Sequence, residues 1–167
     1  LTFTGDATLH NQDGEVTLPQ NITINGGVTG SITGAFGERT LVNGVLAGSG
    51  ILLVDGGSAG LDHPALNTPN TNTRTIQNRG STGHANLRVN SLTDSANPIE
   101  LGRPNSTNGA GLLDYLNGAT TPLVLNNRQI VITDRGTGTN DRISGIRNYA
   151  SAANTVTVNT DLSVTTT

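Results

Sequence analysis

The sequence contains no cysteine, methionine or tryptophan, and only two phenylalanines and two tyrosines among 167 residues. The absence of cysteine excludes disulfides, thiolate zinc sites and thiol nucleophiles within this chain. Large side chains are scarce and the hydrophobic content is 33%, which argues against one spherical core, because ordinary globular domains are more apolar. Burial must come from many small contributions by valine, leucine, isoleucine and alanine.

Lysine is also absent, and all nine basic residues are arginines in a chain with a net charge of −3. The sequence has no basic stripe or arm, so nucleic acid and anionic membranes are not expected partners. The longest apolar run, residues 51–54, is far too short to insert across a membrane. The joint absence of cysteine, methionine and lysine favours an extracellular location. Because the sequence opens without methionine and without an export signal, we expect a removed signal or a segment of a longer protein.

The 22 glycines and the many threonines, asparagines and serines raise the alternative of a disordered polar chain. Two observations weigh against disorder. Charged residues make up only 13% of the chain, and aliphatic residues recur along it in short β-branched pairs and triplets. A solvated chain has no reason to keep such a pattern, so we expect residues 1–167 to form a single folded domain.

Short segments with aliphatic or β-branched residues at alternate positions, bounded by Gly, Asn, Asp or Pro, predict many strands. Helical periodicity is not sustained over any window of about 12 residues, so the fold class is all-β with almost no α-helix. One exception is residues 110–119, where a single helical turn fits. The predicted strands cover residues 1–5, 15–19, 22–25, 30–35, 39–46, 50–55, 73–78, 86–92, 98–101, 122–125, 128–133, 155–160 and 161–165.

The gaps between these strands are often too short for a crossover helix, as between 123–125 and 130–132. Antiparallel hairpins remain possible, as does a parallel β-solenoid, in which the chain turns a corner and continues. A solenoid needs small aliphatics inside and Gly, Asn or Asp at its corners, and this composition, with 20 asparagines, meets both demands. At roughly 20–25 residues per coil the chain would make about seven coils. We expect residues 62–73 and 103–111 to form loops that project from the coils.

Residues 87–102, LRVNSLTDSANPIELG, and 109–133, GAGLLDYLNGATTPLVLNNRQIVIT, resemble the autotransporter-associated β-strand repeat of secreted bacterial surface proteins. Residues 43–57 carry a weaker similarity. The resemblance implies a right-handed parallel β-helix in an exported passenger, stalk or surface fibre, with no catalytic residue attached to the motif. The matching positions are Leu87, Val89, Asn90, Leu92, Asp94, Leu101, Gly102, Leu112 or Leu113, Tyr115, Gly118, Ala119, Thr120, Asn127, Arg128, Ile130 and Ile132.

The sequence departs from this family in two ways. It has no C-terminal membrane-barrel segment, and the family's L-x-L-S-G-x-N-T-Y-x-G unit is missing. A self-transporting autotransporter is therefore not supported.

Candidate chemical groups are isolated along the sequence. His10, His63 and His84 have no second ligand at metal-binding spacing, and Asp62 beside His63 does not by itself predict a catalytic triad. Residues 134–145, DRGTGTNDRISG, are similar to a calcium-binding glycine-aspartate turn, but a corner with an arginine-carboxylate contact fits them better. Most of the single carboxylates are interpreted as turn residues; they are Asp55, Asp94, Asp114, Asp134 and Asp141.

We therefore expect a structural protein, not an enzyme, with no catalytic, cofactor or metal site. The chain would act as a stalk, filament or matrix scaffold at a bacterial cell surface. Since neither end carries an obvious polar cap, copies or flanking segments are expected to stack on the solenoid ends and form a homo-oligomer or fibre. Two alternatives stay open: an adhesin or carbohydrate-binding module that binds surface glycans through residues 62–73 and 103–111, and a polysaccharide lyase or hydrolase.

Overall fold

The structure is a computed structural model that describes the chain in twelve ranges. Every regular element in them is a β-strand, so the all-β prediction is confirmed for these residues. No helix in this part of the chain is long and apolar enough to cross a membrane. The described ranges are 1–34, 39–42, 44–56, 65–66, 76–80, 84–89, 94–102, 110–115, 123–133, 144–148, 156–160 and 162–165.

The strands form four parallel sheets, named A to D. Sheet A contains β1 (Thr2–Phe3), β4 (Ile22–Ile24) and β7 (Leu46–Gly48), and sheet D contains β14 (Leu123–Leu125) and β17 (Val156–Val158). Sheet B contains β2 (Ala7–Asn11), β5 (Thr29–Gly34), β8 (Ile51–Gly56), β10 (Ile76–Gly80), β12 (Ile99–Leu101), β15 (Ile130–Thr133) and β18 (Leu162–Thr165). Sheet C contains β3 (Glu15–Leu18), β6 (Arg39–Val42), β9 (Ala65–Leu66), β11 (His84–Val89), β13 (Ala110–Tyr115) and β16 (Gly145–Asn148).

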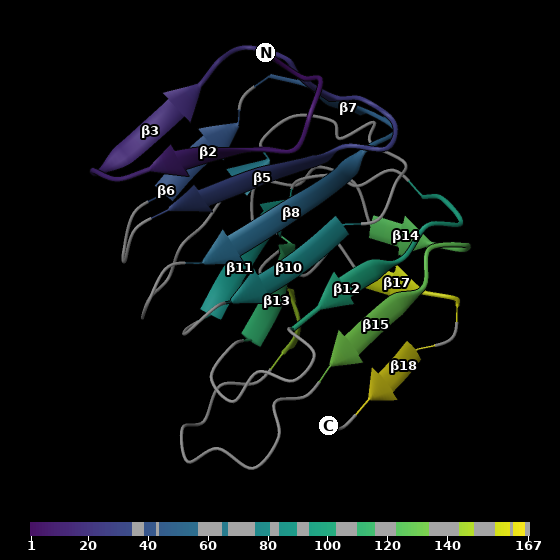
Figure 1. The fold of residues 1–167 in the computed structure, drawn as a ribbon. Coiled ribbons are helices and arrows are strands. Elements are labelled where there is room, and N and C mark those ends of the chain that lie inside the picture. The colour runs from purple at the N-terminus through teal and green to yellow at the C-terminus, as the bar shows by residue number, and fades with distance from the viewer. Residues whose placement is uncertain are drawn as a thin grey trace.

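Within each sheet the strands lie side by side in chain order, and consecutive strands of the chain belong to different sheets. We call one passage of the chain through the sheets a pass; β1, β2 and β3 form the first pass and β4, β5 and β6 the second. Figure 1 shows the strands of sheet B descending in order from the N-terminal to the C-terminal end, with sheet C behind them. Each new pass therefore adds one strand to each of the sheets that it visits.

The register gives the length of a pass. Thr2 pairs with Thr23 and Ala7 with Gly30, so the chain returns to the same position after 21 to 23 residues near its N-terminal end. Leu123 pairs with Val156 and Ile130 with Leu162, so a return takes 32 or 33 residues near the C-terminal end. The later passes are longer because more residues connect their strands.

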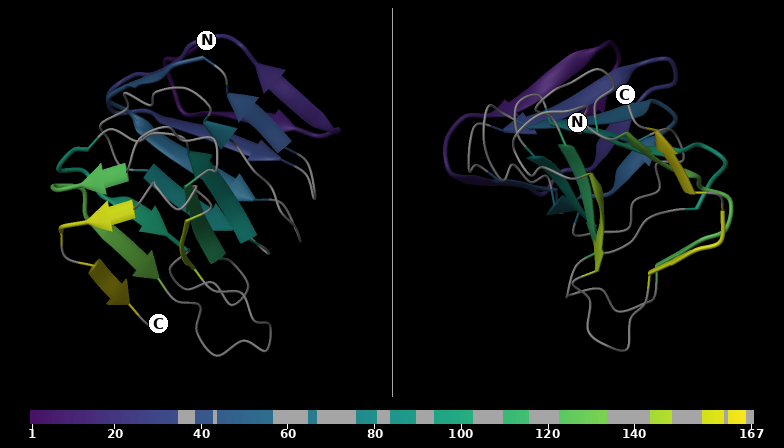
Figure 2. Two further views of the ribbon diagram at one scale, coloured as in Figure 1. Left: turned by 180° about the vertical axis from the view of Figure 1, so that it is seen from behind. Right: turned by 90° about the horizontal axis from the view of Figure 1, so that it is seen from below.

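One apolar core runs through the strands. Figure 2 shows the ribbon of these strands from behind and from below. Alternate residues of the strands point into this core: Ile22 and Ile24 of β4 are buried with Thr23 half-buried between them, and β12 and β14 follow the same rule. The core contains one aromatic residue among the described positions. Its members are Phe3, Ile22, Ile24, Ile32, Val42, Leu46, Leu52, Val54, Leu87, Ile99, Leu101, Leu113, Leu123, Leu125 and Ile130.

Two glycines are required where a strand gives way to a corner. Gly48 and Gly102 have φ angles of 103° and 94°, in the region that side chains rarely adopt. A Cβ at Gly48 would collide with the backbone carbonyl of Ile24, one pass earlier, and a Cβ at Gly102 with the carbonyl of Thr133, one pass later. Only glycine lets neighbouring passes approach so closely at these points.

Most predicted strands coincide with observed ones, but four expectations are wrong. Residues 110–115 form β13, so the expected helical turn is absent there, because these residues pair on both sides with β11 and β16. Residues 39–46 are not one strand: β6 ends at Val42, and β7 begins at Leu46 in another sheet. The predicted 62–73 loop contains β9, which pairs between β6 and β11, and the 103–111 loop overlaps the first residues of β13. Strands β2 and β16 were not predicted.

Candidate functional site

The densest polar cluster in the described residues lies where β14 turns into β15. We call it the Asp94 corner; it comprises Asp94, Asn97, Asn126, Asn127, Arg128, Asn159 and Thr160. The residues belong to three consecutive passes, as the hydrogen-bond partners lie 31 to 34 residues apart in the sequence.

The Asp94 carboxylate occupies a nest of backbone donors. It accepts the backbone N–H of Asn126 at 3.1 Å, of Asn127 at 3.1 Å and of Arg128 at 3.0 Å, and the side-chain Nδ2 of Asn127 donates to it at 2.9 Å. Successive N–H groups that converge on one point form a concavity suited to an anion. Here the anion is a side chain of the preceding pass, so Asp94 fixes the backbone of the next corner.

These hydrogen bonds determine the ionisation of Asp94. Partial desolvation raises the pKa of the carboxyl, but the hydrogen bonds from Asn127, Asn126 and Arg128 outweigh it and leave the pKa below its ordinary value. Asp94 is therefore ionised at neutral pH, which strengthens each of the four donated hydrogen bonds.

Arg128 brings a positive charge into the interior. Its side chain has no exposed surface, and its Nε donates to the backbone carbonyl of Asn97 at 3.0 Å. Burial lowers the pKa of Arg128 to about 10, while the negative charge of Asp94 opposes this shift. The guanidinium stays charged at neutral pH, and a buried charge is tolerated only when it is paired and hydrogen-bonded. Asp94 therefore stabilises the corner in two ways: it accepts backbone hydrogen bonds, and its negative charge favours the charged form of Arg128.

The following pass extends the cluster. Asn159 Nδ2 donates to Asn126 Oδ1 at 2.7 Å, the backbone N–H of Asn159 donates to the carbonyl of Leu125 at 2.8 Å, and Thr160 Oγ1 donates to the carbonyl of Arg128 at 2.9 Å. Side chains and backbone thus join the corners of three passes in one polar column.

Simpler versions of the same bond occur at the N-terminal end. Asp6 Oδ1 accepts the backbone N–H of Thr29 at 2.7 Å, and Asn21 Oδ1 accepts that of Val45 at 2.9 Å. In each case a carboxylate or amide oxygen satisfies a backbone donor of the next pass. Aspartate and asparagine at the corners therefore have a defined structural task.

The other candidates from the sequence are not brought together. His10 lies on β2 in sheet B, where its Nδ1 is 2.8 Å from Thr33 Oγ1, and His84 begins β11 in sheet C. His63 and Asp62 lie outside the described residues. No group of three or more His, Asp or Glu residues in the described ranges is placed to hold a metal ion.

The single carboxylates divide into three groups. Asp94 lies between β11 and β12, as its interpretation as a turn residue requires. That interpretation is wrong for Asp55 and Asp114, which lie within β8 and β13 because the surrounding residues pair with neighbouring strands. Asp134 and Asp141 lie outside the described residues, as does most of the 134–145 segment proposed for calcium.

The sequence alone does not predict the Asp94 corner as a site, although three of its members belong to the family resemblance. Asp94, Asn127 and Arg128 are all matching positions of the resemblance described above, and the structure brings these three together. Nothing in their local sequence indicates that Arg128 is buried or that Asp94 reaches the next pass. That information lies in the pairing of distant strands.

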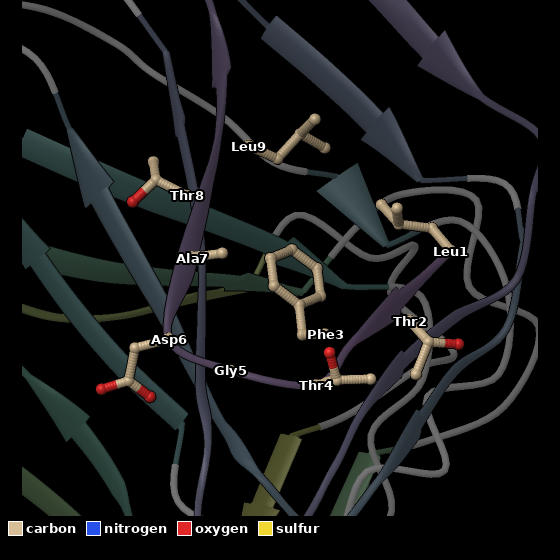
Figure 3. A pocket seen from close by; sticks show the side chains of 9 residues that line it. All are labelled: Leu1, Thr2, Phe3, Thr4, Gly5, Asp6, Ala7, Thr8 and Leu9. Atoms are coloured by element: carbon tan, nitrogen blue, oxygen red, sulfur yellow. The ribbon is translucent and has the colours of Figure 1, made fainter.

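A hollow of about 380 Å³ lies at the N-terminal end of the stack and is lined by residues 1–9. In Figure 3, Leu1, Phe3 and Leu9 lie on one side of the β2 ribbon, whereas Asp6 and Thr8 point to the other side. Phe3 of the apolar core thus borders this hollow. Its lining contains no pair of groups that could act as acid and base.

The chain matches no protein-family model, no curated protein and no solved structure.

Proposed function

We propose that this chain is part of a right-handed parallel β-helix that serves as a structural scaffold, in a stalk, filament or matrix at a bacterial cell surface. The observation that carries the proposal is the order of the strands: each new strand of sheet B pairs in parallel with the one before it, through seven strands. A chain that revisits its sheets in this manner adds length with each pass. The right hand is the one that parallel crossovers adopt in nearly all known cases.

The polar groups of the Asp94 corner favour a structural role over a catalytic one. The carboxylate of Asp94 is occupied by four donors, and Arg128 is buried beneath it. A group used for catalysis must be able to reach a substrate. These groups instead join successive passes by hydrogen bonds, as a structural scaffold requires.

The extracellular and bacterial parts of the proposal depend on composition and on the resemblance. A chain without cysteine, methionine or lysine suits an exposed surface. The resemblance to autotransporter-associated repeats gains support from Asp94, Asn127 and Arg128, because three scattered matching positions meet in one cluster.

For partners, we propose that copies of the chain pair end to end. At the N-terminal end Leu1 and Val16 are exposed, and at the C-terminal end Leu162 and Val164 of β18 are 55% and 59% exposed. Val164 pairs with Ile132, and Ile132 pairs with Leu101, which is buried in the core. Val164 therefore extends this column of aliphatic residues, which we call the core column. Among the described strands β18 pairs with β15 alone, so a strand added at its other edge would cover the column and pair with the backbone of β18.

Electron microscopy and sedimentation of the pure 167-residue chain test this proposal. We expect elongated particles whose length grows with concentration. Val164→Asp, which places a charge in the core column, should abolish them, whereas Ser163→Asp, which places the same charge on the other face of β18, should not. A chain that is monomeric at every concentration and shows no elongated particle would contradict end-to-end pairing.

A further inference from the structure

The corner between β4 and β5 is a glycine-rich turn at the surface. Asn25, Gly26 and Gly27 are all exposed, and Gly27 has a φ of 78°, as the third position of a type II turn requires. The turn is closed by the backbone N–H of Val28, which donates to the carbonyl of Asn25 at 3.2 Å. The Asn25 side chain is therefore presented to water beside a residue that has no side chain.

The amide of Asn25 differs from the other asparagine amides at the corners. Those of Asn11, Asn21, Asn126, Asn127 and Asn159 all make hydrogen bonds. Within the described ranges the Asn25 amide makes none, and the backbone N–H of Gly26 makes none either. The side-chain carbonyl of Asn25 and the nitrogen of Gly26 are thus adjacent, exposed and not engaged elsewhere.

We propose that Asn25 is a site of spontaneous deamidation. The nitrogen of Gly26 attacks Cγ of Asn25, a C–N bond forms, and the side-chain amide leaves as ammonia with the proton of the Gly26 N–H. The product is a five-membered cyclic imide. Water opens either carbonyl of the imide and gives aspartate or isoaspartate, so the net reaction is amide plus water to carboxylic acid plus ammonia.

Gly26 is the residue that makes the reaction accessible. Without a Cβ it leaves the approach of its nitrogen to Cγ unhindered and its backbone free to rotate. A Cβ at Gly26 would lie 2.9 Å from Ser49 Oγ, the end of an exposed side chain that can move aside. Gly26→Ala is therefore expected to fold and to slow the reaction.

The modification would change the first two passes. The backbone N–H of Asn25 donates to the carbonyl of Phe3 at 3.1 Å, and the preceding residue, Ile24, is fully buried. Isoaspartate inserts an extra carbon into the backbone at this point and adds a negative charge. The bond to Phe3 would be displaced, and the pairing of β1 with β4 would weaken as the protein ages.

The experiment follows individual asparagines by fragmentation mass spectrometry after the folded chain is kept at 37 °C and mildly alkaline pH. The peptide from residues 1 to 39, released by cleavage after the first arginine, contains Asn11, Asn21 and Asn25. We expect Asn25 to gain the mass of an NH2-to-OH exchange while Asn11 and Asn21, whose amides are hydrogen-bonded, change little. Because other Asn-Gly pairs occur at 43–44, 108–109 and 117–118, the mass of the intact chain would not identify the site.

Two variants and one reference complete the test. Gly26→Ala should slow the change at residue 25 several-fold, and Asn25→Gln, which removes the five-membered geometry, should nearly abolish it. The urea-denatured chain gives the unrestrained rate, and circular dichroism checks that each variant folds. Reaction at Asn25 only in the denatured chain, or an unchanged rate in folded Gly26→Ala, would overturn the proposal; if Gly26→Ala does not fold, an unchanged rate in Asn25→Gln would do so.

Discussion

The carboxylate of Asp94 accepts the backbone N–H of Arg128 at 3.0 Å, although the two residues are 34 positions apart in the sequence. Arg128 in turn donates from its buried Nε to the carbonyl of Asn97, three residues after Asp94. The two passes are therefore joined in both directions, from carboxylate to backbone and from guanidinium to backbone.

Asp94→Asn should lower the free energy of unfolding by about 1 kcal/mol, the difference between hydrogen bonds to a charged and to a neutral acceptor, and the exposed setting keeps the effect modest. An amide can face the donors with its single oxygen, but it loses the charge that strengthens these hydrogen bonds. Urea denaturation measures the effect. Asp13→Asn is the matched control, since the Asp13 carboxylate is exposed and makes no hydrogen bond in the described ranges. Equal losses in the two variants would contradict the assigned role of Asp94.

The contribution of Asp94 should depend on pH. Its folded-state pKa lies below the unfolded value, so its stabilising effect is fully present above the unfolded pKa of about 4 and is lost as the pH falls through the folded pKa. Urea unfolding of the wild type and of Asp94→Asn, measured from neutral pH to about pH 3, isolates this effect. The stability difference should be constant near neutrality and shrink on acidification. A difference that stays constant into the acid range would show that the carboxylate charge does not matter.

Two substitutions of Arg128 should lower the stability of the protein by different amounts. Arg128→Ala removes the largest fully buried side chain of the described residues and should cost about 3 kcal/mol, because the space it leaves is only partly refilled. Arg128→Met fills most of that space without burying a charge, and its cost should be lower, about 1–2 kcal/mol, because the carbonyl of Asn97 still loses its donor. Chemical denaturation of both variants checks the order. If Met is as destabilising as Ala, the charge of Arg128 and its bond to Asn97 matter more than its volume.

The sequence revealed those parts of the fold that local alternation encodes. Ile22-Thr23-Ile24 and Ile99-Glu100-Leu101 predict strands because buried aliphatic residues alternate with a half-buried polar residue. Ala7–Asn11 and Gly145–Asn148 each contain a single large aliphatic residue, Leu9 or Ile146, so their local sequence does not predict strands. They are strands because they pair with β5 and β13. The burial of Arg128 could not be predicted either, because it also depends on residues far away in the sequence. Its neighbours in the sequence are polar, and the carbonyl that holds it belongs to Asn97, in another pass.

Strand β14 offers the sharpest test of the core, because two neighbouring aliphatic residues point in opposite directions. Leu125 has no exposed surface, whereas Val124 is 42% exposed. Leu125→Ala should therefore cost about 2–5 kcal/mol, the range for deletion of a buried leucine side chain, and Val124→Ala should cost less than about 1 kcal/mol, mainly through lost β-propensity. Urea unfolding followed by circular dichroism compares the two variants. Similar costs at both positions would mean that β14 does not present Leu125 to the core, and the register of β14 with β17 would then have to be wrong.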